Sequence, residues 1–249
     1  MTPSPGGHLE PVAERSVARR APGKPRREPG PVTREDIPAL LRGIRRASRA
    51  WPLPGVSQVG LDSRDPFRVL VACILSLRTR DETTGPAATR LFALAPTPGA
   101  LARLPARSIE RVIFPVSFYR TKARTLRALA RTLIDHHGGQ VPDSLDALLA
   151  LKGVGRKTAN LVVTVGFGKP GICVDTHVHR ISNRWGLVRT KTPDKTEFAL
   201  REVLPRRYWI SYNDLLVAFG QRVCHPLSPR CSVCPVSDRC PRNGVLRSR

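Results

Sequence analysis

Long hydrophobic runs are missing from this 249-residue chain. Nowhere do about 18 or more apolar residues follow one another, so the sequence predicts no membrane-spanning helix. The first residues, MTPSPGGHLEPVAERS, also lack the charged-then-apolar order of a secretory leader. A hydrophobic content of 41% is typical of a globular protein. We therefore expect an intracellular protein with one or two folded domains.

Acidic residues are scarce as well. The chain has 19 Asp and Glu against 42 Lys and Arg, which gives a net charge of +23. Residues 1–35 hold only seven of the basic residues and four of the acidic ones, so most of the excess charge belongs to the folded part. Such a surface indicates nucleic acid as the partner, because neutralised phosphates release counterions. A surface that serves solubility alone is the alternative that charge leaves open.

Lysine is the rarer of the two basic residues, with seven in the whole chain. Two of the seven, Lys152 and Lys157, flank a Gly-Val-Gly turn in the stretch LKGVGRKTAN (151–160). Gly153 and Gly155 permit a positive φ and a close approach of backbone to a phosphate. The amides of such a turn, followed by a helix that begins near Arg156, are typical of an anion site. We expect this hairpin to hold DNA phosphates without reading bases.

Lys157 falls in the first turn of that second helix. The positive end of the helix dipole, with Lys152 and Arg156 nearby, disfavours an ammonium group there. A lysine that sheds its proton can act as a nucleophile and form a Schiff base, which arginine cannot do. The alternative is that Lys157 is one more cation on a DNA-binding surface. Its position alone does not separate the two.

Asp175 stands in VDTHVHR (174–180), between an apolar segment and a predicted helix. An ordinary helix N-cap is one interpretation, and a catalytic carboxylate is the other. The two are compatible, because a cap holds the carboxylate rigid. His177 and His179 are two positions apart and do not share a helix face, so we expect core or surface histidines rather than metal ligands.

The rest of the chain shows helical spacing interrupted by Pro and Gly, and few segments alternate with period two. Thr33 and Asp36 resemble a capping box ahead of Ile37, Leu40 and Leu41. We therefore predict an all-α fold. Helices are expected at 33–51, 65–78, 84–93, 97–103, 107–114, 121–136, 144–150, 156–167, 175–185, 193–202 and 208–222.

Four of the six cysteines lie in one short segment with the spacing C-x6-C-x2-C-x5-C; they are Cys224, Cys231, Cys234 and Cys240. Disulfides are not the usual fate of cysteine in an intracellular chain. Four thiolates this close need a cation, and either tetrahedral zinc or a four-iron cluster satisfies them. Four unligated thiols are the remaining alternative. Cys73 and Cys173 sit in apolar runs and are expected to be buried small hydrophobes.

Taken together, these residues resemble the endonuclease III family of the helix-hairpin-helix DNA glycosylase superfamily. The resemblance runs from about residue 35 to 241 and rests on LKGVGRKTAN, VDTHVHRISNRWG and the four-cysteine spacing. It implies a two-domain all-α fold with DNA between the domains, and a [4Fe-4S] cluster rather than zinc. Composition predicts a disordered, basic, proline-rich tail (1–33), because that segment has seven prolines and no aromatic residue. The parts expected after it are an N-terminal helix packed with the cluster domain (34–58), a six-helix domain (59–170), the C-terminal helices with the cluster (171–241) and a short tail (242–249).

The resemblance also assigns roles to single residues. It makes Lys157 the nucleophile and Asp175 the catalytic carboxylate. Three features depart from the usual family pattern. Arg78 stands where Gln is frequent, and Phe118 stands where an apolar wedge enters the duplex. The loop between Cys224 and Cys231 is often basic in the family, but here only Arg230 is fully charged. The DNA contacts expected by resemblance are Lys152, Gly153, Val154, Gly155, Arg156, Arg78, Asp81, Phe118 and Arg230.

The function that the resemblance implies is base excision repair. The chain would remove oxidised pyrimidines from double-stranded DNA and cut the strand at the abasic site by β-elimination through a lysine Schiff base. A monomer in the bacterial cytoplasm, associated with the nucleoid, is expected. The alternatives are a lyase that acts mainly on abasic sites and a non-catalytic DNA-binding or redox-sensing module.

Overall fold

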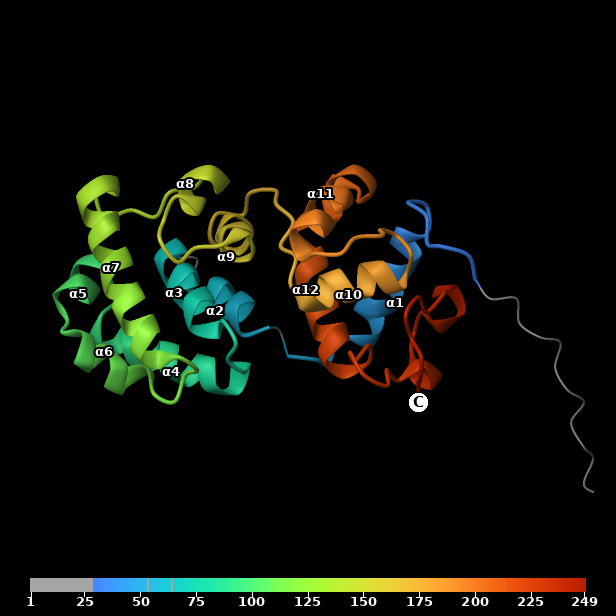
Figure 1. The fold of residues 1–249 in the computed structure, drawn as a ribbon, viewed down its shortest axis with the longest axis horizontal. Coiled ribbons are helices and arrows are strands. Elements are labelled where there is room, and N and C mark those ends of the chain that lie inside the picture. The colour runs from blue at the N-terminus through green and yellow to red at the C-terminus, as the bar shows by residue number, and fades with distance from the viewer. Residues whose placement is uncertain (1–28, 53, 64) are drawn as a thin grey trace, which may run out of the picture.

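The computed structural model describes residues 29–52, 54–63 and 65–249. These residues form helices joined by turns and loops, and no strand occurs among them, which confirms the all-α prediction. Figure 1 shows two lobes side by side, linked by the chain that leaves α1 (Ile37–Ala47) and by the segment that follows α9 (Arg156–Leu161).

None of the helices described is both long and apolar enough to cross a membrane.

The first lobe is built around α3 (Pro66–Ser76), whose residues from Val69 to Leu75 are all buried. Asp65 caps this helix by accepting a hydrogen bond from the Phe67 amide, and Pro66 occupies its first position. The other elements of the lobe are α2 (Gly55–Ser63), α4 (Asp81–Leu94), α5 (Pro98–Arg103), α6 (Ala106–Ile113), α7 (Tyr119–His137), α8 (Leu145–Leu149), α9 and a π-helical turn (Val162–Gly166).

The second lobe joins the two ends of the described chain, so that blue α1 lies among orange and red helices in Figure 1. Its core packs Trp185, Tyr212 and Phe219 against Ile37 and Ile44 of α1. Its other helices are α10 (Thr176–Arg184), α11 (Pro193–Val203) and α12 (Trp209–Arg222), with short 3-10 turns at Arg206–Tyr208, Cys231–Val233 and Ser237–Arg239. The cysteine-rich segment follows α12.

The structure moves three of the predicted boundaries. Segment 34–58 does not belong wholly to the second lobe, because α2 begins at Gly55 and Val56 lies in the core of the first lobe. Val32, placed in the tail by prediction, is buried and donates its amide to the Trp185 carbonyl at 2.8 Å. The predicted C-terminal tail also returns to the fold, since the Ser232 amide donates to the Arg249 carbonyl. The remainder of the predicted tail, 1–28, lies outside the described residues.

Helix α2 is the element that helical periodicity did not predict. Its packing depends on Gly60, where an added Cβ would stand 2.1 Å from Cγ1 of Val165 in the π-helical turn. That turn is itself a departure from the predicted helix 156–167. The Thr164 hydroxyl donates to the Asn160 carbonyl at 2.9 Å, a local bond that competes with regular helical bonding.

A buried lysine fixes the loop that follows α3. Lys122 of α7 donates from Nζ to the carbonyls of Leu75 and Leu77 at 2.7 and 2.6 Å and to Oγ1 of Thr79 at 3.1 Å. Burial lowers the pKa of Lys122 to about 8. Three acceptors match the three donors of an ammonium group, so Lys122 satisfies the free carbonyls at the end of α3 and holds the loop that carries Arg78.

We predict that Lys122→Met lowers the free energy of unfolding by about 1–3 kcal/mol, because it leaves buried carbonyls without donors. Lys169→Met is the matched control, since Lys169 forms a half-exposed ion pair with Asp143 and should change stability little. Urea unfolding followed by circular dichroism measures both variants. Equal stabilities would mean that the Lys122 bonds do not stabilise the fold.

Candidate active site

The Gly-Val-Gly turn connects α8 to α9 and differs at its two glycines. Gly153 has φ +89°, and a Cβ there would meet Cγ2 of Thr125 at 2.7 Å, so the predicted need for glycine is confirmed. Gly155 has an extended φ of −95° and is the N-cap of α9, with nothing within 4 Å of an added Cβ. Val154 is buried, and its amide already donates to the Leu151 carbonyl. Val154 therefore anchors the turn in the core.

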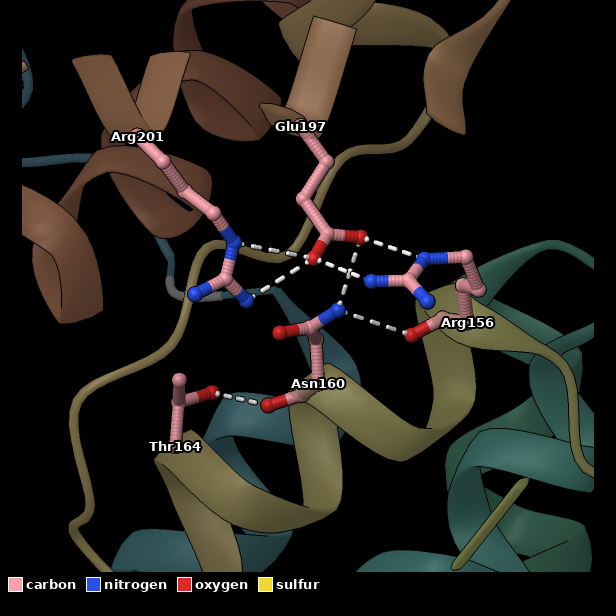
Figure 2. Close-up of polar contacts among 5 residues, drawn as sticks. All are labelled: Arg156, Asn160, Thr164, Glu197 and Arg201. Carbon is pink, nitrogen blue, oxygen red and sulfur yellow. Dashed lines mark hydrogen bonds and ion pairs between the residues drawn. The ribbon is translucent and has the colours of Figure 1, made fainter. Parts of the chain in front are cut away.

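Arg156 is engaged in an interdomain ion pair. Its Nε donates to Oε2 of Glu197 at 3.0 Å and its Nη2 to Oε1 at 2.7 Å, as Figure 2 shows. The same guanidinium stacks over the ring of Phe198, 4.8 Å from the ring centroid. Arg156 was predicted to contact DNA phosphate. In the structure its Nε and Nη2 already donate to Glu197, so these two nitrogens are not free for that contact.

Asp175 is the N-cap of α10, as the sequence indicated. Its Oδ1 accepts hydrogen bonds from the amides of His177 and Val178, both at 2.9 Å. Both bonds go to one carboxylate oxygen, so the cap does not use Oδ2. A half-buried carboxylate is thereby fixed at the start of a helix with one oxygen left for chemistry.

A cavity of about 480 Å³ brings the predicted catalytic pair together at the boundary of the two lobes. Lys157 of the first lobe and Asp175 of the second both line it, and so do Arg78 and Asp81. His177 joins them; burial lowers the pKa of its imidazole, and its Nδ1 lies 3.0 Å from Nη2 of Arg180. An amine and a carboxylate from separate domains therefore face one space large enough for a nucleoside-sized group.

The backbone of Lys157 is tied to the segment that leads to Asp175. The Cys173 thiol donates to the Lys157 carbonyl at 3.6 Å, and burial raises the pKa of that thiol, which therefore keeps its proton. Asn213 of α12 donates to the Cys173 carbonyl at 3.2 Å. Cys73 and Cys173 are both buried in the first core, which confirms that part of the prediction.

Of the remaining predicted contacts, Phe118 and Lys152 do not line this cavity, whereas Arg78 and Asp81 do. Phe118 is 58% exposed, and Arg78 stacks over its ring at 4.9 Å; both residues have φ +57°. A non-glycine residue in this left-handed region is strained, which is typical of side chains held for a function. Lys152 is exposed at the hairpin. Asp81 accepts from the Gly55 amide at 3.4 Å, and so it braces α2 against the start of α4.

The four clustered cysteines line a second cavity together, and Arg230 lies on its wall. Burial raises the pKa of Cys234 to about 12 and of Cys240 to about 11. These two thiols therefore keep their protons at neutral pH unless a bound metal ion displaces them. Across the described part of the chain, no three His, Cys, Asp or Glu side chains converge on a single-ion site.

Two arginines of α10 were missed by sequence reasoning. Arg180 donates from Nη2 to the Cys224 carbonyl at 2.7 Å. Arg184, which is buried, donates from Nη1 to Sγ of Cys224 at 3.2 Å and to the His225 carbonyl at 2.6 Å. The only feature of the sequence that could have indicated their role is their spacing of four residues, which places both on one face of the helix. Through them the helix capped by Asp175 supports the cysteine segment.

Comparisons with known proteins agree with this site. Residues 71–206 match the family model described as "HhH-GPD superfamily base excision DNA repair protein", and the chain is a base excision DNA repair protein of that superfamily. The chain is 49% identical over 176 residues to Endonuclease III from Thermotoga maritima, an overlap of 71% of this chain and 83% of the relative. The chain belongs to the endonuclease III family.

Two further relatives extend the comparison. Endonuclease III homolog 1, chloroplastic, from Arabidopsis thaliana is 38% identical over 219 residues; the match covers 81% of this chain but only 58% of the plant protein. A solved structure of a trapped Endonuclease III–DNA covalent intermediate, an estranged-adenine complex, superposes with a TM-score of 0.75 at 35% identity. That superposition covers 84% of this chain and 96% of the other.

We predict that Asp175→Asn and Asp175→Ala separate the cap from the carboxylate charge. Asn caps helices as well as Asp does, whereas Ala costs about 1 kcal/mol, so only Asp175→Ala should lower the melting temperature. Both variants should lose strand cleavage at abasic sites. Retention of full cleavage by Asp175→Asn would show that the carboxylate acts only as a cap.

Proposed function

We propose that this chain is a bifunctional DNA glycosylase and AP lyase that removes oxidised pyrimidines from duplex DNA. The observation that carries the proposal is the shared cavity, in which the Lys157 amine and the Asp175 carboxylate are presented from opposite domains. A sugar carbon that enters this space meets a nucleophile and a negative charge together. Family membership supports the same reaction class.

In the proposed reaction the damaged nucleotide is first flipped out of the duplex into the cavity. The unprotonated Lys157 amine attacks C1′ and forms a C–N bond while the bond from C1′ to the damaged nucleobase breaks. The nucleobase leaves with the bonding electrons and takes a proton from water. Asp175 stabilises the positive charge that develops on the sugar and accepts the proton that the amine gives up. The bond between C1′ and O4′ then breaks, O4′ takes the proton held by Asp175, and the opened sugar is left as an iminium ion between Lys157 and C1′.

Strand cleavage follows from the iminium ion. It acidifies the C2′ proton, and removal of that proton expels the 3′ phosphate by β-elimination. Water then hydrolyses the imine and returns Lys157 as the amine. Arg78 and Phe118 are suited to enter the duplex beside the flipped nucleotide, because one is cationic, the other is apolar, and both are held in strained backbone.

DNA binding in this proposal uses the hairpin of the first lobe. Exposed Lys152 contributes charge, and the open space next to Gly155 lets a phosphate approach the start of α9. Exposed Arg230 contributes charge from the second lobe. We propose that the chain acts as a monomer on DNA of the nucleoid.

The cysteine segment fits a [4Fe-4S] cluster in this proposal. Its four thiols line one cavity, and in such a cluster each thiolate binds a different iron, so the sulfur atoms need not converge on one point. Arg184 donates from Nη1 to Sγ of Cys224, so a cation already lies beside one of the four expected ligands. The cluster would supply structural support, since it ties the chain after α12 to helix α10, and no step of the reaction involves it.

We predict that Lys157→Gln abolishes the DNA–protein complex trapped by borohydride on abasic-site duplex, with DNA affinity nearly unchanged. Lys152→Gln is the matched control; it should keep trapping, weaken binding and reduce the salt slope of log K by about one unit. Gel electrophoresis and fluorescence anisotropy report the two properties. A trapped complex in Lys157→Gln would show that another amine is the nucleophile.

We predict that protein purified without chelators contains about four iron atoms per chain, which is the composition of the cluster. Cys231→Ser should lose iron and become sensitive to proteolysis near its C-terminus, whereas Cys73→Ser should retain iron. Zinc in place of iron, from cells grown with ample iron, would contradict this assignment.

A further inference from the structure

Glu197 of α11 is a carboxylate almost without solvent contact, since its side chain is 2% exposed. Oε1 accepts from Nη2 of Arg156 at 2.7 Å and from Nη2 of Arg201 at 2.9 Å. Oε2 accepts from Nε of Arg156 and from Nδ2 of Asn160, both at 3.0 Å. Figure 2 shows the carboxylate enclosed by these three donor residues, Arg156, Asn160 and Arg201.

The three donor residues come from two domains. Arg201 belongs to the same helix as Glu197, four residues further on. Arg156 and Asn160 belong to α9 of the first lobe, so their bonds cross the boundary that contains the reaction cavity. Asn160 also donates to the Arg156 carbonyl at 3.1 Å. The first turn of α9, which carries Lys157, is therefore held at both ends of the turn.

The second lobe continues this connection towards Asp175. Thr196, next to Glu197 in α11, has its hydroxyl 2.6 Å from Nδ1 of His179 in α10. Asp175 is the cap of that same helix. Helix α11 thus contacts both sides of the cavity, because Glu197 binds the residue before Lys157 and its neighbour Thr196 contacts the helix that presents the carboxylate.

Glu197 remains ionised at neutral pH. Burial alone raises the pKa of its carboxyl group, but the hydrogen bonds from Arg156 and Arg201 outweigh burial and lower that pKa. A buried ion pair contributes little net stability compared with apolar residues of the same size, because both charges lose their hydration. Directional bonds of this kind are therefore better suited to fix geometry than to stabilise the fold.

We propose that Glu197 is a positioning residue, which holds Arg156 across the domain boundary and thereby sets the place of the Lys157 amine relative to Asp175. The proposal rests on the assignment of Lys157 as nucleophile. Covalent attack is sensitive to placement, and a shift of about 1 Å can cost on the order of a hundredfold in rate. Arg201 binds the same carboxylate from within the second lobe, so its bonds do not cross the domain boundary.

The test compares Arg156→Gln with Arg201→Gln in the full chain. Both variants remove one guanidinium from Glu197, but only Arg156→Gln removes bonds between Glu197 and α9. We expect Arg156→Gln to slow single-turnover borohydride trapping by about tenfold or more on saturating abasic-site duplex. Arg201→Gln should stay within about threefold of the unmodified chain. Arg156→Lys keeps one charged donor, so its trapping rate should lie between the rates of these two variants. It replaces Arg156→Gln if that variant does not fold.

Affinity and melting temperature are measured alongside the rate, well below the melting temperature of every variant. Equal rates for Arg156→Gln and Arg201→Gln would overturn the proposal. So would an Arg156→Gln variant that weakens DNA binding at an unchanged trapping rate, because Arg156 would then be a phosphate contact. Trapping by the unmodified chain and its loss in Lys157→Gln report on the nucleophile separately, whatever the result for Arg156.

Discussion

The arrangement of the active site depends on one buried carboxylate between two domains. Glu197 binds Arg156 and Asn160 across the boundary, and these residues flank Lys157 in the first turn of α9. Asp175 reaches the same cavity from the other domain. Neither domain alone contains both of the proposed reacting groups, so the proposed chemistry requires the two lobes to be held in register. A further bond across the boundary, from the Ser57 hydroxyl to Oδ1 of Asp214 at 2.6 Å, supports the same register.

Local features of the sequence predicted much of this structure. Asp175 caps α10 because an acceptor side chain before a helix satisfies free amides, and that rule needs no knowledge of the fold. Gly153 needs a positive φ for a similarly local reason. Periodicity placed most helices to within a few residues, and the three ordered motifs identified the family.

Features that depend on distant residues could not be predicted in this way. Arg156 looked like a phosphate contact because its partner, Glu197, is far away in sequence and has no local signal. Helix α2 was not predicted from the sequence, because its packing depends on the contact between Gly60 and the distant Val165. Val32 looked like part of a tail, although its hydrogen bond to Trp185 closes the second core. In each case the observed structure follows from a tertiary contact, which outweighs the local preference of the sequence.

The most direct test of the central claim is peptide mapping of the borohydride-reduced adduct between the unmodified chain and abasic-site DNA. The account predicts that mass spectrometry finds the reduced sugar on the side chain of Lys157 alone. An adduct on Lys152 would contradict it, because Lys152 does not line the cavity that also contains Asp175. An adduct on the amino group of Met1 would contradict it as well, because the nucleophile would then be an amine other than that of Lys157.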